Sequence, residues 1–115
     1  MKFSEPLRIE IVNYKKYKTV NDVVADGTIV CPKDFTFDVT VPKGVLFILG
    51  GLMFSKIIRA VAVHDYEYTV KKNPRKVADV QLRDMMIVDG LNRVSAYIAY
   101  FCTRLFGWKY WNKED

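Results

Sequence analysis

The hydrophobic pattern of this chain changes its period near Ser55. Before that point, Leu7, Ile9 and Ile11 alternate with charged residues, which is the pattern of a strand with one buried face. After it, apolar residues recur at three- and four-residue steps, as on a helix with one broad buried stripe. This order predicts an α+β fold, in which a small curled antiparallel sheet in the N-terminal third is followed by a three-helix bundle.

Further short strands are expected at residues 19–24 and 28–31. Between them lie Asp26 and Gly27, a dipeptide that favours a two-residue hairpin turn. Residues 35–39 alternate again, with Phe37 at their centre, so they are expected to extend the same sheet.

Turn and capping residues mark the limits of the helices. Asn73 is the expected N-cap of the second helix, with Pro74 at its first position, and Gly90 is expected to end that helix. The third helix is expected from about residue 92 to residue 106, where Gly107 stops it. The aromatic tail at residues 108–111 should then pack back on the body, and its two tryptophans are also candidates for a partner or lipid contact.

Composition is consistent with a single domain, residues 1–115. Half of the chain is hydrophobic and 14% is aromatic, which suffices for one core. The net charge of +5 favours anionic partners such as phospholipid headgroups, cell-wall polymers or nucleic acid. Nucleic acid is the least favoured of these, because the basic turn at residues 71–76 has no interleaved aromatic platform.

The most apolar stretch, residues 44–54, is too short to span a membrane. Lys56 and Arg59 interrupt it before the roughly 20 apolar residues that a bilayer requires. No transmembrane segment is therefore expected, and a buried segment is favoured over an interfacial anchor. The N-terminus lacks the apolar run of a signal peptide. Cys31 and Cys102 are expected to be reduced thiols of a cytosolic protein, with one long-range disulfide as the alternative.

Candidate chemistry centres on His64, the only histidine of the chain. On a helix, Tyr68 lies one turn after His64 on the same face, and Asp65 points about 100° away. The basic turn can fold the chain into a helical hairpin, which brings Asp79 of the next helix to the same depth as His64. The sequence thus predicts a His-Asp hairpin that gathers a histidine, two carboxylates and a phenol.

Two interpretations of this cluster remain open. If it is catalytic, Asp79 and Tyr68 hold the imidazole while His64 takes a proton from water, and Asp65 binds a hard cation such as calcium or orients the substrate. If it is structural, the same residues clamp the hairpin in register without chemistry. The catalytic interpretation gains weight because burying carboxylates is costly unless function or pairing compensates.

Two residues near the end of the sheet are candidates for substrate binding. Asp38 is an acid between apolar neighbours and is expected to close the site, together with the hydroxyl of Thr40. Other schemes fare worse: phosphohydrolases of the His-Asp domain type and zinc sites of the His-Glu-x-x-His type need more than one histidine. Cys31 and Cys102 are expected to be core thiols rather than nucleophiles.

Four blocks of the sequence resemble a family of small, uncharacterised phage and prophage proteins, a domain of unknown function. The blocks are CPKDFTFDVTVP at residues 31–42, AVHDYEY at 62–68, VAD at 77–79 and RLFGW at 104–108. The family pattern has a Val-Pro-x-Gly-Phe-x-Thr-Asp strand, a Ser-x-Pro-Arg turn, a His-Asp-x-x-Tyr helix, an Ala-Asp helix and a C-terminal Phe-Gly aromatic end. Thr40 stands where the family has serine, Lys43 where it has arginine, and Asp34 replaces the strand glycine. The resemblance implies phage or prophage origin and no established activity.

A more distant resemblance is to the secretory phospholipase A family. The His-Asp-x-x-Tyr motif, followed by an acid on an antiparallel helix, is similar to its catalytic hairpin. By position, the resemblance implies that His64 is the base, Asp65 the calcium ligand, and Asp79 and Tyr68 the pair that orients the histidine. Two glycines at residues 50–51 lie where that family has its calcium loop, but the rest of the loop signature and the cysteines that flank the helices are absent.

The leading hypothesis is therefore a phage-encoded hydrolase. Its His64 would activate water against an ester-type bond in an anionic small molecule, a lipid or another envelope-derived substrate. The alternative is a non-enzymatic virion or assembly protein, tail-associated, that contacts other virion proteins. Either protein would act in the host cytoplasm during infection, and the second would also be found in the virion.

Overall fold

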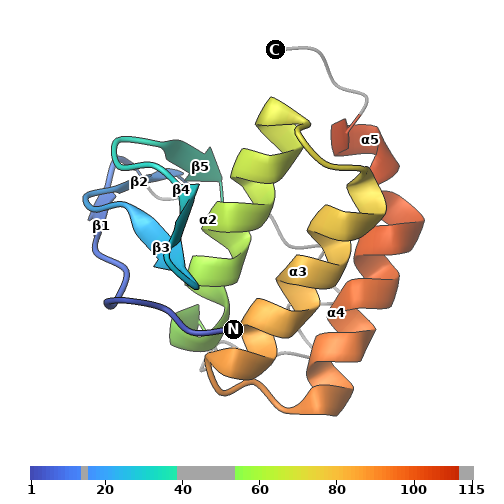
Figure 1. Ribbon diagram of the computed structural model, residues 1–115. Coiled ribbons are helices and arrows are strands. Elements are labelled where there is room, and N and C mark those ends of the chain that lie inside the picture. The colour runs from blue at the N-terminus through green and yellow to red at the C-terminus, as the bar shows by residue number, and fades with distance from the viewer. Residues whose placement is uncertain (14–15, 39–53, 112–115) are drawn as a thin grey trace.

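A computed structural model describes residues 1–13, 16–38 and 54–111, and Figure 1 shows its elements. The strands are β1 (Ile9–Ile11), β2 (Lys16–Thr19), β3 (Val23–Ala25), β4 (Thr28–Cys31) and β5 (Thr36–Asp38). The helices are α2 (Phe54–Val70), α3 (Arg75–Val88), α4 (Arg93–Phe106) and the short α5 (Trp108–Trp111). Strands precede helices, so the predicted α+β fold with three long helices is confirmed.

The antiparallel strands divide into two small sheets. One has three strands in the order β1-β2-β5, and the other is the hairpin of β3 and β4. The hairpin turns at Asp26 and Gly27, which both have positive φ, 52° and 80°. Two successive residues of positive φ are what a type I′ turn requires, so the predicted hairpin is confirmed.

The strand predicted over residues 19–24 is wrong, because the chain breaks there between the two sheets. β2 ends at Thr19 and β3 begins at Val23. In between, the Asn21 side chain accepts a hydrogen bond from the backbone N–H of Arg8 at 2.8 Å, and the Asp22 side chain accepts one from that of Lys33 at 2.8 Å. Such side-chain bonds to the backbone compete with a strand ladder and favour a turn.

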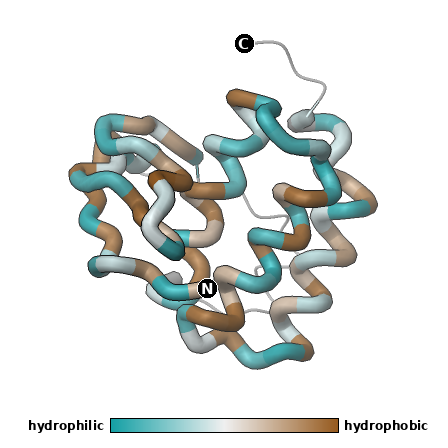
Figure 2. Tube along the Cα trace, in the orientation of Figure 1, coloured by the Kyte–Doolittle hydropathy of each residue, from teal (hydrophilic) through white to brown (hydrophobic). Residues whose placement is uncertain are grey.

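Helix α2 lies between the sheets and the other two long helices (Figure 1). One side of α2 contacts β4 and β5, and its other side packs on α3, which in turn packs on α4. The turn from α2 to α3 is hydrophilic, as Figure 2 shows. Lys71 has a φ of 53° and donates its backbone N–H to the carbonyl of Glu67 at 2.9 Å, which ends α2.

Helix ends follow local capping rules, with one exception. Gly90 has a φ of 104°, and Leu91 N–H bonds the carbonyl of Met86 at 2.9 Å, so α3 ends in the Schellman motif that glycine permits. Asn92 caps α4 through a 2.8 Å bond from the backbone N–H of Ser95. The predicted N-cap of α3 is wrong. Pro74 holds that position without a side-chain bond, because the amide of Asn73 turns instead to the Glu67 carboxylate, 3.4 Å away.

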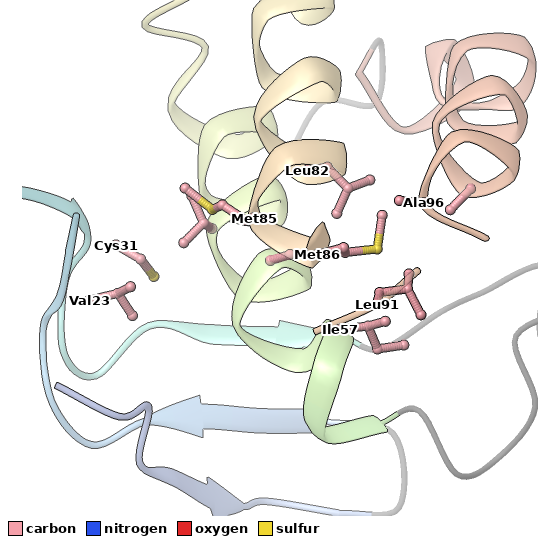
Figure 3. Close-up of a cluster of buried hydrophobic side chains, with 11 residues drawn as sticks. Val23, Cys31, Ile57, Leu82, Met85, Met86, Leu91 and Ala96 are labelled. Carbon is pink, nitrogen blue, oxygen red and sulfur yellow. The ribbon is translucent and has the colours of Figure 1, made fainter. Parts of the chain in front are cut away.

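The main hydrophobic cluster joins the β3–β4 hairpin to all three long helices (Figure 3). Its buried members include Val23, Cys31, Ile57, Leu82, Met85, Met86, Leu91 and Ala96. A second cluster of Phe37, Ile58 and Ala62 joins β5 to α2. Both clusters contain residues of α2, so its position, and that of His64 on it, is set by packing on two sides.

In the described part of the chain, no helix has the length and apolarity needed to cross a bilayer, as expected. The apolar stretch predicted to be buried, residues 44–54, lies outside the described residues except for its last position. Cys31 and Cys102 are both free, which confirms the prediction of two thiols.

Candidate functional site

The site is built around Asp79, a fully buried carboxylate on α3. Its side chain has no exposed area, and its helical neighbours Ala78 and Leu82 are also buried. An ionised carboxylate in such a place is strongly destabilising unless hydrogen-bond donors surround it. The other residues of the site supply these hydrogen-bond donors.

Helix α2 supplies two donors, as the sequence predicted. The Nε2 atom of His64 lies 2.8 Å from Oδ1 of Asp79, and the hydroxyl of Tyr68 donates to the same oxygen at 2.6 Å. The two rings pack against each other with centroids 4.2 Å apart, as their four-residue spacing requires. The helical hairpin therefore brings His64, Tyr68 and Asp79 together.

Two arginines complete the site, and neither was predicted to belong to it. Arg104 of α4 donates to Oδ2 of Asp79 at 2.9 Å, and Arg75 of α3 approaches the same oxygen at 3.5 Å. Arg75 also donates to the main-chain carbonyls of Thr103 and Arg104. The position of Arg75, four residues before Asp79, was a usable signal for an ion pair on one helix. No pattern in the sequence indicated that α4 would bring Arg104 to α3.

These contacts decide which groups are ionised. Burial by itself would raise the pKa of Asp79, but hydrogen bonds from His64, Tyr68 and Arg104 outweigh it and hold that pKa below its ordinary value. Burial, together with the bond to Asp79, raises the pKa of Tyr68. Near neutral pH, Asp79 is thus an anion that only accepts, and Tyr68 is a phenol that donates.

The ionised state of Asp79 also assigns the tautomer of His64. Because the carboxylate can only accept, Nε2 of His64 must carry the proton that it donates. In the neutral ring, Nδ1 then bears the free lone pair. Nδ1 makes no hydrogen bond to the described residues, and it is not among their buried atoms without a partner. The His64 side chain keeps 16% of its surface exposed, so its basic nitrogen faces solvent.

Asp65 lies away from this cluster, as its position on the helix predicts. Its negative charge contributes, after burial, to raising the pKa of Cys31 on β4 to about 12. Asp65 therefore faces the β3–β4 hairpin, whereas His64 faces α3. The thiol of Cys31 is buried and protonated, which argues against its use as a nucleophile.

The calcium role predicted for Asp65 requires oxygen ligands besides its own carboxylate. Calcium takes six to eight oxygen ligands. Among the described residues there is no group of three or more histidine, cysteine or acidic side chains that could hold a metal ion. Calcium also takes backbone carbonyl oxygens, and residues 39–53, with the two glycines at 50–51, lie outside the described residues, so calcium binding at Asp65 remains a prediction.

Of the two predicted substrate-binding residues, only Asp38 lies in the described part of the chain. Asp38 ends β5 with an exposed side chain, and no hydrogen bond or ion pair links it to the pair in the described ranges. Thr40 lies outside the described residues. Their role in binding remains a prediction.

Gly107 lets the end of α4 approach the site closely. A Cβ atom built on Gly107 would lie 2.6 Å from the hydroxyl oxygen of Tyr68 and 3.1 Å from a guanidinium nitrogen of Arg75. Beyond it, α5 folds back so that the ring of Trp111 packs edge-on against Tyr68, with centroids 5.1 Å apart. The predicted packing of the aromatic tail is therefore confirmed for Trp111, while Trp108 stays half-exposed.

We expect Gly107→Ala to lower the free energy of unfolding by about 1–3 kcal/mol, because the added methyl would lie 2.5 Å from the carbonyl oxygen of Thr103 and 2.6 Å from the hydroxyl of Tyr68, so the end of α4 and Tyr68 must shift. Urea unfolding measures this change. The matched control is Gly27→Ala, which adds a methyl where no atom lies within 4 Å, so its cost comes from the positive φ alone. If Gly107→Ala leaves both the tryptophan fluorescence, which reports on the contact of Trp111 with Tyr68, and the stability unchanged, the close approach is not a constraint.

Comparison with known proteins places the chain in a family without assigning an activity. A family model described as "Protein of unknown function (DUF1353)" matches residues 11–103. None of the curated proteins and none of the solved structures gives a significant match.

Proposed function

The chain belongs to the DUF1353 family of proteins of unknown function, and we propose that it is a hydrolase in which His64 activates water against an ester-type bond. One observation carries the proposal. The imidazole is held through Nε2 by an ionised, buried carboxylate, which leaves the lone pair of Nδ1 toward solvent. An imidazole oriented in this way by a carboxylate is the usual general base for attack by water.

Each neighbour of His64 has a definable part in this reaction. As Nδ1 takes a proton from water, the ring becomes an imidazolium, and the charge of Asp79 stabilises it across the 2.8 Å bond. Tyr68 and Arg104 are positioning residues, because they bind Asp79 and do not contact the reacting water. The protonated ring can then return the proton to the leaving alcohol.

The proposed substrate is an anionic ester of the kind found in cell envelopes. The net charge of +5 attracts anions, and two guanidiniums surround the single buried carboxylate of the site. The phage resemblance of the four sequence blocks agrees with an envelope substrate, and the protein would then act in the host cytoplasm during infection.

We expect the protein to release acid from dioctanoyl phosphatidylglycerol and none from the matched dialkyl ether lipid, which has no ester bond. A pH-stat titration measures the release directly. Activity on the ester alone supports the proposal. A folded protein that releases acid neither from the phospholipid nor from simpler anionic carboxylic esters contradicts it.

A second candidate function rests on the number of helices that Asp79 connects. Donors reach this carboxylate from α2, α3 and α4. Such a contact can serve as a clamp in a non-enzymatic virion or assembly protein, as the alternative hypothesis holds. Under that function the protein should co-purify with assembled phage particles in a defined copy number, and a particle preparation without it would contradict this candidate.

A further inference from the structure

Helix α4 and the start of α5 carry an apolar stripe that faces solvent. The stripe consists of Val94, Tyr97, Phe101 and Leu105, which are spaced by three or four residues and so share one face of α4, and of Trp108, the first residue of α5. Their exposed fractions lie between 41% and 71%. A contiguous exposed stripe of large apolar side chains marks a site that binds a protein or a membrane.

This stripe is not the face by which α4 packs in the bundle. The buried residues of α4 are Ser95, Ala96 and Ala99, which lie on the other side of the helix, toward α3. The opposite face has only a shallow, open depression, lined by Arg93, Val94, Tyr97, Ile98 and Phe101. Helix α4 thus has two apolar faces, of which the fold uses one.

The charged residues of α4 and α5 are all basic, whereas on α3 the acid Asp84 pairs with Arg83 at 3.1 Å. Between Asp89 and Glu114 the sequence has no acidic residue, whereas Arg93, Arg104 and Lys109 lie in α4 and α5. Arg83 of α3 adds a guanidinium 4.8 Å from the ring centroid of Tyr97, at the edge of the stripe. An apolar surface with a cationic border is complementary to an anionic surface.

The same charges disfavour a second copy of the chain as the occupant. If two α4 helices paired in antiparallel fashion, Arg93 of one copy would approach Lys109 of the other. In a parallel pair, each cation would face the equivalent cation of the second copy. Neither arrangement offers a carboxylate on these helices to offset the repulsion.

We propose that this stripe docks the protein on an anionic phospholipid bilayer, with α4 lying in the plane of the interface. Phe101 and Leu105 would enter the acyl boundary, and Trp108 would lie at the headgroup level that tryptophan favours. The exposed Arg93 and Lys109 would bind lipid phosphates, while Arg104 stays bonded to Asp79. This surface is separate from His64, so docking does not depend on hydrolysis.

The test is co-sedimentation with vesicles of ether-linked lipids, which the proposed hydrolase cannot cleave. We expect binding to vesicles of equal parts phosphatidylglycerol and phosphatidylcholine, and at least about tenfold weaker binding at 0.5 M salt, because screening removes the attraction. The variant Phe101→Ser/Leu105→Ser should lose binding by about tenfold or more. The matched control, Ile29→Ser, changes a residue that is 56% exposed on β4 and should bind as the wild type does.

Three results would overturn the proposal. One is no binding of the folded protein to anionic vesicles, and another is equal binding to pure phosphatidylcholine. The third is a concentration-dependent dimer, seen by analytical ultracentrifugation, that the double variant abolishes, which would make a second copy the occupant. Because the readout is binding to lipids without ester bonds, none of these results bears on whether His64 is catalytic.

Discussion

Replacing Asp79 by asparagine is expected to lower the free energy of unfolding at pH 7 by about 3 kcal/mol. The amide has nearly the same shape, but it removes the negative charge that Arg104 and Arg75 contact at 2.9 and 3.5 Å. Breaking a buried ion pair by removing one partner typically costs about 3–5 kcal/mol, because the other charge is left uncompensated. The two arginine side chains are 31% and 19% exposed, which places the effect at the lower end.

The stability that Asp79→Asn removes should be largest near neutral pH and should disappear as the pH falls. The pKa of Asp79 is lowered on folding from its ordinary value of 3.8, so its ionised form stabilises the folded state above that pH. The contribution is then lost as the pH falls below 3.8 toward the lowered pKa of the folded protein. Urea unfolding at a series of pH values should show the wild type and the Asp79→Asn variant approaching equal stability in acid.

Asp84→Asn is the matched control, with the same chemical change on the same helix. Asp84 pairs with Arg83 at 3.1 Å, but its side chain is 45% exposed. Exposed pairs contribute about 0–1 kcal/mol, so we expect little change. Equal effects of the two substitutions, or a loss for Asp79→Asn that does not vary with pH, would show that the buried carboxylate does not hold the three helices together.

Replacing His64 by asparagine is expected to lower the rate of ester hydrolysis by about 10²–10⁴-fold, the range typical of a general base. Its effect on stability should be small, about 1 kcal/mol for one lost hydrogen bond. Asp79 keeps the bonds from Tyr68 and Arg104, and the His64 side chain is partly exposed. The pH-stat assay and urea unfolding together measure both quantities.

The comparison variant is Tyr68→Phe, which removes a 2.6 Å hydrogen bond to the same carboxylate oxygen but leaves the base in place. We expect Tyr68→Phe to lower the free energy of unfolding clearly and the rate of ester hydrolysis only slightly. For His64→Ala, added imidazole should restore part of the activity, since the ring reaches solvent. A His64 variant that keeps full activity per folded molecule, while losing several kcal/mol of stability, would identify the cluster as a clamp.

Much of the site could be predicted from the sequence because its main contacts are local in geometry. The spacing of His64 and Tyr68 places them on one face of a helix, and the short basic turn returns Asp79 to their level. Helical rise and turn length suffice for that inference. The Asp26-Gly27 turn and the end of α3 at Gly90 were predicted for the same reason, since positive φ is a property of the residue type.

The features of the fold and the site that were not predicted depend on contacts between segments far apart in the chain. Arg104 reaches Asp79 across 25 residues, and the break of the predicted strand at residues 20–22 arises from bonds to residues 8 and 33. No periodicity or spacing encodes such contacts. They exist because the bundle must neutralise a buried carboxylate and because the side chains of Asn21 and Asp22 bond the backbone of neighbouring segments.

By itself, then, the sequence determined the order of strands and helices, the hairpin that carries the histidine, and the pairing of that histidine with an acid. Each follows from the period of apolar residues and from the φ preferences of a few turn residues. Only the tertiary structure decided that the acid is shared by two arginines, that the second nitrogen of the ring faces solvent, and that α4 leaves an apolar face exposed. Those outcomes depend on how three helices pack, because packing sets which side chains lose water and which keep it.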